Sequence, residues 1–479
     1  MSTIQRIAKN TTVLFIATVI GYILGFFTTL YTARYLGAEG FGIISLALSL
    51  TSIFGVLTDL GLNNLIVREV ARDKSLTNKY VSNTLSIKIL FSFLTFVLLI
   101  LTTELMGYTW KVNIIIYLIA LNVIFVAFSA IFNAIFQSYE KMEYQAVGNI
   151  LNAVLMFAGV LIVIHFNFDI LAFGFVYFIS GLVFLVFNIL IYSWKFALPK
   201  MDIDWSFWRP TIKESLPFAV TGIFTMIYFW IDSVILSLMM GNEVVGWYNA
   251  SYRLILIFAA LYSVYMISIF PVLSGLYKTS QKSIKIAYER SFKYMLVVNV
   301  PIVIFITFLA NKIILCIYGA GYIPSIIALQ VLIWAIIFMF INTLSLNLLG
   351  SVNKQVIVAK IVAFGSIFNI VLNVILIPYF SYIGSSAATV ATELVMLPIF
   401  LYVLKKENYV DISSLIKDVL KIIICSIIFI ITIILLNQFN LWLSIIISLI
   451  VYLTMIFITK TLNAKDISLI RSLFERKTD

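Results

Sequence analysis

Apolar runs of about 20 residues recur along the chain from Thr12 to Lys460, separated by short polar breaks. A run of this length crosses the hydrocarbon core of a bilayer as one α-helix, and this restricts the fold more than any other feature. Hydrophobic residues make up 62% of the 479 residues and charged residues 11%, whereas a soluble domain carries about 25% charged residues. The sequence therefore predicts an all-α polytopic membrane protein with about fourteen transmembrane helices. We place the spans near Thr12–Arg34, Phe41–Leu60, Ser82–Thr103, Ile114–Gln137, Ala146–Phe166, Ile170–Trp194, Lys213–Met239, Gly246–Pro271, Phe292–Ile317, Ile326–Gly350, Gln355–Pro378, Tyr382–Leu404, Lys417–Asn437 and Leu441–Lys460.

Lysine and arginine cluster in alternate loops, which is the pattern that orients spans in a membrane. With a cytosolic N-terminus, the predicted outer loops keep only Arg34, Lys111 and Lys312. We therefore expect a multi-pass protein of the cell membrane with both termini in the cytosol and an even number of spans. The net charge of +11 follows from this bias, so we expect no nucleic-acid partner.

A short motif repeats at a fixed distance along the chain. Leu36-Gly37-Ala38-Glu39-Gly40-Phe41-Gly42 shares glycine, glutamate and glycine with Met240-Gly241-Asn242-Glu243-Val244-Val245-Gly246, each 204 positions later. The offset covers an even number of spans, so the two halves have the same orientation, as in parallel transporter repeats. This predicts two pseudo-symmetric six-helix bundles, residues 1–200 and 201–410. Residues 411–479 would add two transmembrane helices and a basic cytosolic tail.

Arg253 lies inside the eighth predicted span, where an arginine costs roughly 2.5–3.5 kcal/mol near the bilayer centre. Asp232 in the seventh span is expected at a similar depth, roughly 10–14 Å below the outer boundary. Two interpretations are open: an Asp–Arg pair that locks two helices, or an arginine that faces a cavity while Asp232 controls its availability. An arginine fork suits a diphosphate, and Asn249 lies one turn earlier on the same face.

Two further acidic residues are candidates for coupling or gating. Glu393 lies near the middle of the twelfth span and could bind a proton or Na⁺, or hydrogen-bond a neighbouring helix. Asp59 ends the second span, just before Gly61, whose freedom for a left-handed turn predicts a helix end there. The segment Leu65–Arg72, which follows this turn, is predicted to form an amphipathic helix along the inner interface. Lys88 is close enough to a cytosolic span end to snorkel.

Aromatic side chains could line a cavity for sugar rings, and Tyr31, Tyr228 and Tyr252 are the candidates. Aromatic residues make up 15% of the chain, so most of them are expected to serve packing or lipid contact. The pair Asp202 and Asp204 resembles the Asp-x-Asp element of sugar-nucleotide enzymes, but no other acidic residue supports it there. The sequence also has no glycine loop for phosphate. We therefore expect no metal, no cofactor and no enzymatic activity.

Several motifs are similar to one family of membrane proteins. Ala33-Arg34-Tyr35-Leu36-Gly37-Ala38-Glu39-Gly40-Phe41-Gly42, Asp59-Leu60-Gly61-Leu62 with Arg68-Glu69, and Gly246-Trp247-Tyr248-Asn249-Ala250-Ser251-Tyr252-Arg253-Leu254 carry the similarity. They resemble Wzx-type polysaccharide flippases of the multidrug/oligosaccharidyl-lipid/polysaccharide exporter superfamily. The resemblance covers almost the whole chain, because span number and loop sizes also agree.

This resemblance implies two bundles around a central cavity that opens alternately to each side. The implied substrate is an oligosaccharide on a polyprenyl or dolichyl phosphate or diphosphate, moved to the outer leaflet for cell-surface polysaccharide or glycoprotein synthesis. Arg253 matches the position of a cavity arginine in related flippases, and Arg34 is the one arginine of the first span. Membrane lipids and a glycan polymerase or glycosyltransferases are the implied partners. A cation-coupled multidrug exporter and a non-transporting scaffold for glycan assembly are the alternatives.

Overall fold

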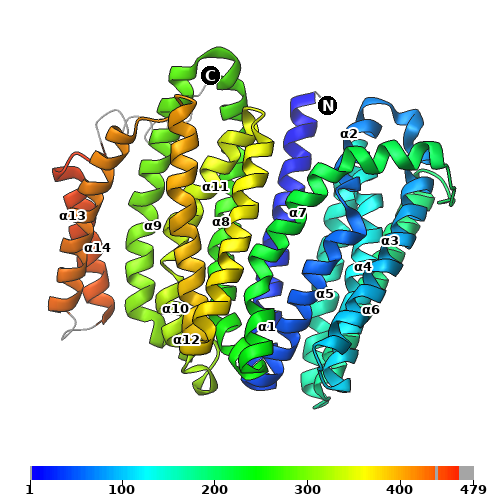
Figure 1. Ribbon diagram of the computed structural model, residues 1–479, viewed down its shortest axis with the longest axis horizontal. Coiled ribbons are helices and arrows are strands. Elements are labelled where there is room, and N and C mark those ends of the chain that lie inside the picture. The colour runs from blue at the N-terminus through cyan, green and yellow to red at the C-terminus, as the bar shows by residue number, and fades with distance from the viewer. Residues whose placement is uncertain (1–2, 437–440, 463–479) are drawn as a thin grey trace. The chain divides into compact units, whose positions relative to one another are not determined.

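The computed structural model of the protein describes residues 3–436 and 441–462, and these residues form helices joined by short turns (Figure 1). The first half contains α1 (Thr3–Asp59), α2 (Leu62–Arg72), η1 (Lys74–Leu76), α3 (Thr77–Leu105), α4 (Trp110–Ser138), α5 (Met142–His165) and α6 (Ile170–Lys195). The second half contains α7 (Trp205–Met240), α8 (Asn242–Thr279), α9 (Gln281–Ile317), η2 (Ala320–Tyr322), α10 (Ser325–Leu332), α11 (Ala335–Ser351), α12 (Gln355–Lys406), α13 (Ile412–Leu436) and α14 (Leu441–Ile458).

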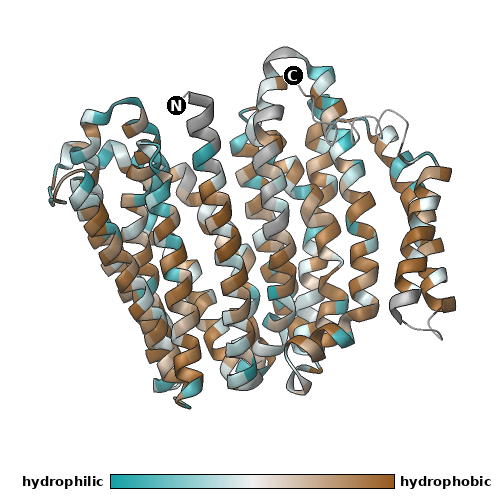
Figure 2. Cartoon of the chain, turned by 180° about the vertical axis from the view of Figure 1, so that it is seen from behind, coloured by the Kyte–Doolittle hydropathy of each residue, from teal (hydrophilic) through white to brown (hydrophobic). Residues whose placement is uncertain are grey.

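Each of the fourteen predicted spans lies within one of these helices, or within the pair α10–α11, to within two residues, and Asn437 at the end of the thirteenth span lies outside the described residues. In the described residues, nine helices are long and apolar enough to cross a membrane, and the bent pair α10–α11 makes ten. Two of the nine, α1 and α12, each hold two predicted spans, because their backbones break at Gly37 and Ser381. The remaining two spans lie in α8 and α14. Hydrophobic residues line the long helices, and hydrophilic residues gather toward their ends (Figure 2). The predicted fold class is confirmed.

The repeat seen in the sequence reappears in the backbone. Gly37 ends the first span with φ 67° and ψ −176°, and Gly241 ends α7 with φ 89° and ψ 172°. Positive φ with extended ψ is a conformation that only glycine adopts at little cost, which explains glycine at both equivalent positions. Each glycine turns the chain back into an antiparallel helix.

The two repeated turns also pack against each other in a reciprocal way. A Cβ atom added to Gly42 would lie 1.7 Å from the carbonyl oxygen of Asn242, and one added to Gly246 would lie 1.9 Å from that of Ala38. Ala38 and Asn242 occupy the same position in the two copies of the motif, as do Gly42 and Gly246. Glycine is therefore required at both sites by the close approach of the facing backbone, and the contact is self-complementary.

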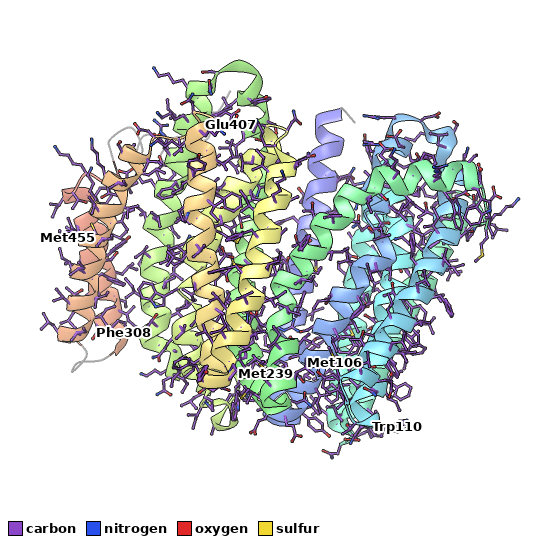
Figure 3. The ribbon with its side chains drawn as sticks, viewed as in Figure 1. Met106, Trp110, Met239, Phe308, Glu407 and Met455 are labelled. Carbon is purple, nitrogen blue, oxygen red and sulfur yellow. The ribbon has the colours of Figure 1, made fainter. Side chains whose placement is uncertain are left out.

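The chain divides into two units. The first unit comprises Met1–Ala250, Ile314–Ser325 and Val362–Ser385, and the second comprises Ser251–Ile313, Ile326–Ile361 and Ser386–Asp479. In the first unit, Met106 and Trp110 flank the α3–α4 turn and lie at the same end as Met239 in α7 (Figure 3), as expected for outer turns. The domain boundaries at residues 200 and 410 stay a prediction, and the basic tail beyond residue 462 lies outside the described residues.

The core of the first unit is built where the second span meets α4 and α6. Ile44, Leu50, Ile116, Ile119 and Phe173 are among its buried side chains. Close packing of such apolar side chains fixes the helices relative to one another within this unit.

The inner turn after α1 ends as the sequence predicts. Gly61 has φ 80° and precedes α2, the predicted amphipathic helix, whose buried residues Leu62, Leu65, Ile66 and Val70 form one face. Gly61 in the left-handed conformation and Asp73 in an extended conformation bound this helix at its two ends.

Candidate functional site

Asp232 lies in α7 and is buried, with 3% of its surface exposed. The hydroxyl of Tyr248 in α8 donates to its Oδ2 over 2.6 Å, and Nδ2 of Asn373 in α12 donates to its Oδ1 over 2.8 Å. The same Asn373 nitrogen also lies 3.1 Å from Oδ1 of Asn369, one turn earlier. Segments of α7, α8 and α12 that all lie in the first unit are therefore joined at this acid.

This cluster is rich in oxygen atoms. Carboxylate and amide oxygens are the ligands that hard cations prefer, and a buried carboxylate can alternatively take up a proton. The groups present therefore suit a cation or a proton. The sequence interpretation named Asp232 but missed Asn369 and Asn373. A signal for them was available, because two asparagines four residues apart in an apolar span lie on one helix face.

Asn249 is placed beside this cluster by the antiparallel pairing of α7 and α8. It is fully buried, and its Nδ2 donates to Ser233 Oγ over 2.9 Å and to the carbonyl oxygen of Val245 over 3.0 Å. Tyr248 is thus bonded to Asp232, and the next residue of α8, Asn249, is bonded to the next residue of α7, Ser233. The structure thus brings two of the predicted site residues, Asp232 and Asn249, into one polar layer.

Arg253 and Tyr252 follow one turn later in α8 and belong to the second unit. Arg253 is half-buried and Tyr252 is buried, with 4% of its surface exposed. Tyr228 lies half-buried in α7, and Tyr31 is 39% exposed in α1, with its ring 6.2 Å from that of Phe157. Pairing between Asp232 and Arg253 stays a prediction.

Arg34 is engaged at a helix end. Its Nε donates to the carbonyl oxygen of Ile317 over 2.7 Å, and another of its nitrogens donates to that of Cys316. These carbonyls belong to the last two residues of α9, where the backbone has no partner of its own and the helix dipole favours a cation. Arg34 therefore has a structural role that the sequence did not indicate.

Glu393 is a buried acid of the second unit. It lies in α12 with 4% of its surface exposed, and Nδ2 of Asn342 in α11 donates to its Oε2 over 2.6 Å and to its backbone oxygen over 2.8 Å. One of the two interpretations from the sequence, a hydrogen bond to a neighbouring helix, is confirmed. A role in ion or proton binding stays a prediction.

Asp59 pairs with Lys88, and here the sequence interpretation of the lysine was wrong. Lys88 does not snorkel: it is fully buried, with Nζ 2.8 Å from Asp59 Oδ1. Nζ also donates to Oδ1 of Asn63 over 3.0 Å and to the carbonyl oxygen of Ala127 over 2.7 Å. An ammonium has three protons, and the three oxygens offer an acceptor for each. The cause is that Lys88 lies on the face of α3 that packs toward the end of α1, not on the face toward the interface.

One member of the acidic pair in the connector between α6 and α7, Asp204, caps a helix. Asp204 is the N-cap of α7 and accepts hydrogen bonds from the backbone amides of Ser206 and Phe207. The Nζ atom of Lys79 lies 3.5 Å from its Oδ2. The hydrogen bonds from Ser206 lower the pKa of Asp204. Within the part of the chain that the structure describes, no group of three His, Cys, Asp or Glu side chains is placed to hold a metal ion.

Long apolar helices that bury aspartate, glutamate and lysine side chains define a polytopic membrane protein of the kind that moves solutes, since intramembrane charges mark transport pathways. The model of the polysaccharide biosynthesis protein family matches residues 7–277, more than half of the chain, and the chain belongs to this family. The family predicted from the motifs, the polysaccharide flippases of the exporter superfamily, is confirmed.

Several individual proteins are similar to this chain. An uncharacterised membrane protein of Methanocaldococcus jannaschii is 30% identical over 129 residues, which is 27% of this chain and 25% of that protein. The "Probable low-salt glycan biosynthesis flippase Agl15" of Haloferax volcanii is 21% identical over 392 residues, 80% of each chain. Among solved structures, the lipid II flippase MurJ in its inward closed conformation is similar in fold, with a TM-score of 0.73 and 18% identity over 92% of this chain and 97% of that one.

Proposed function

We propose that the protein is a flippase that moves an oligosaccharide linked to a polyprenyl or dolichyl phosphate or diphosphate from the cytosolic to the outer leaflet. The observation that carries this proposal is the family match over residues 7–277, in a chain that places an arginine within an apolar helix. The relative from Haloferax volcanii, named as a glycan biosynthesis flippase and aligned over 80% of the chain, supports the same substrate class.

In this proposal Arg253 binds the anionic head group. A phosphate or diphosphate crosses the hydrocarbon core only if its charge is neutralised, and a planar guanidinium can bind two of its oxygens at once. Its position in α8, directly after the polar layer of Asp232 and Asn249, supports this assignment. Tyr31, Tyr228 and Tyr252 would contact the sugars. Arg34 is engaged with the end of α9, so we propose only an accessory contact for its remaining N–H groups.

Movement of the head group needs an alternation between two conformations and a source of free energy. We propose that Asp232 takes up the coupling cation or proton, because its oxygen-rich surroundings suit either ion. Glu393 and Asp59 are the other candidates for coupling or gating. Each holds together helices of its own unit, Glu393 through Asn342 and Asp59 through Lys88.

The distribution of basic residues supports a location in the cell membrane with both termini in the cytosol. In that orientation the head group would be collected from the leaflet where lipid-linked sugars are assembled. A glycan polymerase and glycosyltransferases are the proteins that would supply and use this substrate.

The test is complementation in a cell that lacks its own flippase for lipid-linked oligosaccharide. The wild-type chain should restore glycan at the outer leaflet, Arg253→Ala should abolish it at equal protein level, and Arg253→Lys should retain part of it. Arg209→Ala is the matched control, because Arg209 is exposed in α7 before the apolar span begins at Ala219. If the wild-type chain gives no more outer glycan than the empty vector, the proposed activity is wrong. Full export by both Arg253 variants would exclude this residue as the head-group site.

A further inference from the structure

The connector between α6 and α7 exposes a set of large apolar side chains in the first unit. We define the crossover surface as Trp194, Leu198, Met201, Ile203 and Trp205, whose exposed fractions run from 62% for Ile203 to 74% for Leu198. Trp194 lies in the last turn of α6 and Trp205 is the first residue of α7. Large apolar groups exposed together in this way mark a contact surface.

The backbone of the crossover is held firmly, so the exposure is built into the fold. The amide of Asp202 donates to the carbonyl oxygen of Ser82, and the amide of Asp204 donates to Oδ1 of Asn83 over 2.9 Å. Met201 and Ile203 lie on either side of Asp202 in this anchored segment. Both residues are exposed.

The start of α7 is fixed to the same neighbour. Nε1 of Trp208 donates to Asn83 Oδ1 over 3.1 Å, and the ring of Phe207 packs edge-to-face on Tyr80 with centroids 4.8 Å apart. Trp208 and Phe207 are buried, whereas Trp205 packs one side of its ring on Trp208 and stays 70% exposed. The helix therefore lies with a buried and an exposed aromatic face before the apolar span of α7 begins at Ala219.

Basic side chains accompany this apolar surface. Lys195, Lys200 and Arg209 are exposed along the same segment, against one exposed acid, Asp202. Lys195 places its Nζ 3.3 Å from the ring centroid of Trp194. Tryptophan prefers the boundary between head groups and acyl chains, and lysines beside it attract acidic lipid head groups.

We propose that the crossover surface is a binding site for acidic phospholipids of the leaflet on its side of the membrane. The surface is continuous with two membrane-spanning helices, since α6 ends at Lys195 and the span of α7 starts at Ala219. The apolar side chains lie among the upper acyl chains, and Lys195 and Lys200 contact the acidic head groups. This inference does not depend on which substrate the protein moves.

The test uses the full chain in lipid nanodiscs with an environment-sensitive fluorophore on Leu198→Cys, after replacing Cys316 and Cys425. The matched control is the same label on Ser75→Cys, an exposed position in the α2–α3 turn of the same unit. Quenching is measured with lipids brominated near the head group, either phosphatidylglycerol or phosphatidylcholine at equal content, and with aqueous iodide. Leu198 is mostly exposed, so the label should leave the packing intact, which the unfolding temperature checks.

We expect brominated phosphatidylglycerol to quench the Leu198 label more strongly than brominated phosphatidylcholine, and iodide to quench it less than the Ser75 label. Neutralising Lys195 and Lys200 with Lys195→Gln and Lys200→Gln should lower the preference for acidic lipid about fivefold per lysine. Equal quenching by the two lipids would overturn the acidic-lipid site. Iodide quenching as strong as at Ser75 would show that the surface lies in water, as a docking surface for a protein would.

Discussion

Replacing Gly246 by alanine should force apart the two repeated turns of the first unit. The new methyl group would lie 1.9 Å from the carbonyl oxygen of Ala38, and Cβ atoms essentially never approach a heavy atom within 3.0 Å. The obstacle is backbone on a neighbouring helix, so it cannot turn aside as a flexible side chain would. The helices must separate by about 1 Å, and overpacking of this kind costs about 3 kcal/mol at the upper end of its usual range.

The assay is thermal unfolding of the purified protein in detergent, followed by tryptophan fluorescence. A loss of about 3 kcal/mol lowers the unfolding temperature of a chain this size by about 3 °C, because the entropy of unfolding grows with chain length. Gly275→Ala in the same helix is the control, because a Cβ there meets no atom within 4 Å. That change should stabilise by roughly 0.5–1 kcal/mol, since alanine favours helix over glycine.

The reciprocal geometry also predicts how Gly42→Ala and the double variant should compare with Gly246→Ala. Gly42→Ala should destabilise about as much as Gly246→Ala, because its Cβ would lie 1.7 Å from the carbonyl oxygen of Asn242. The double variant should lose less than the sum, since the first methyl group already separates the backbones that the second would meet. Unchanged stability in either single variant, or full additivity in the double, would refute the self-complementary contact between repeats.

Three other expectations follow from the polar groups. Asp59→Asn should destabilise the protein by about 3–5 kcal/mol, since it leaves Lys88 charged and fully buried. Lys88→Met should cost less, because the Asp59 left behind is 30% exposed. Equal losses of the two variants in chemical unfolding would contradict this. Hydrogen bonds from Ser206 hold the pKa of Asp204 below its ordinary value of 3.8, so their stabilisation is present above pH 3.8 and is lost as the pH falls further. Below pH 3.8 the unfolding temperature of the wild type should therefore fall more steeply with decreasing pH than that of Asp204→Asn. Parallel pH profiles of the two proteins would contradict this. Asp232→Asn should keep the hydrogen bond from Tyr248 but remove the charge, so glycan export should lose its dependence on the coupling ion; export with unchanged ion dependence would exclude Asp232 as the coupling acid.

The spans could be predicted from the sequence because a bilayer leaves the backbone few choices. Every polar backbone group inside the membrane must be bonded within its helix, so apolar length alone locates the helices. The breaks at Gly37 and Gly241 were also readable, since both residues end apolar runs in a repeated motif. The reciprocal contact between Gly42 and Gly246 was not predicted, although the repeat that creates it was visible.

The contacts of the polar residues were harder to predict, because they join helices that are distant in the chain. Asn373 reaches Asp232 across 141 positions, and Arg34 reaches Ile317 across 283. Periodicity within one helix does not reveal such pairs. Lys88 illustrates the difficulty. Its position near the end of a span suggested snorkelling, but it is buried because it lies on the face of α3 that packs against other helices.

The most direct test of the proposed function is binding of polyprenyl diphosphate to the purified protein, compared with uncharged polyprenol of the same length. Native mass spectrometry of wild type, Arg253→Ala and Arg253→Lys in detergent measures the bound fraction of each lipid. The account predicts that the wild type prefers the diphosphate, that Arg253→Ala loses this preference and that Arg253→Lys keeps part of it. Equal preference for the diphosphate in all three proteins would contradict the assignment of Arg253 as the head-group site.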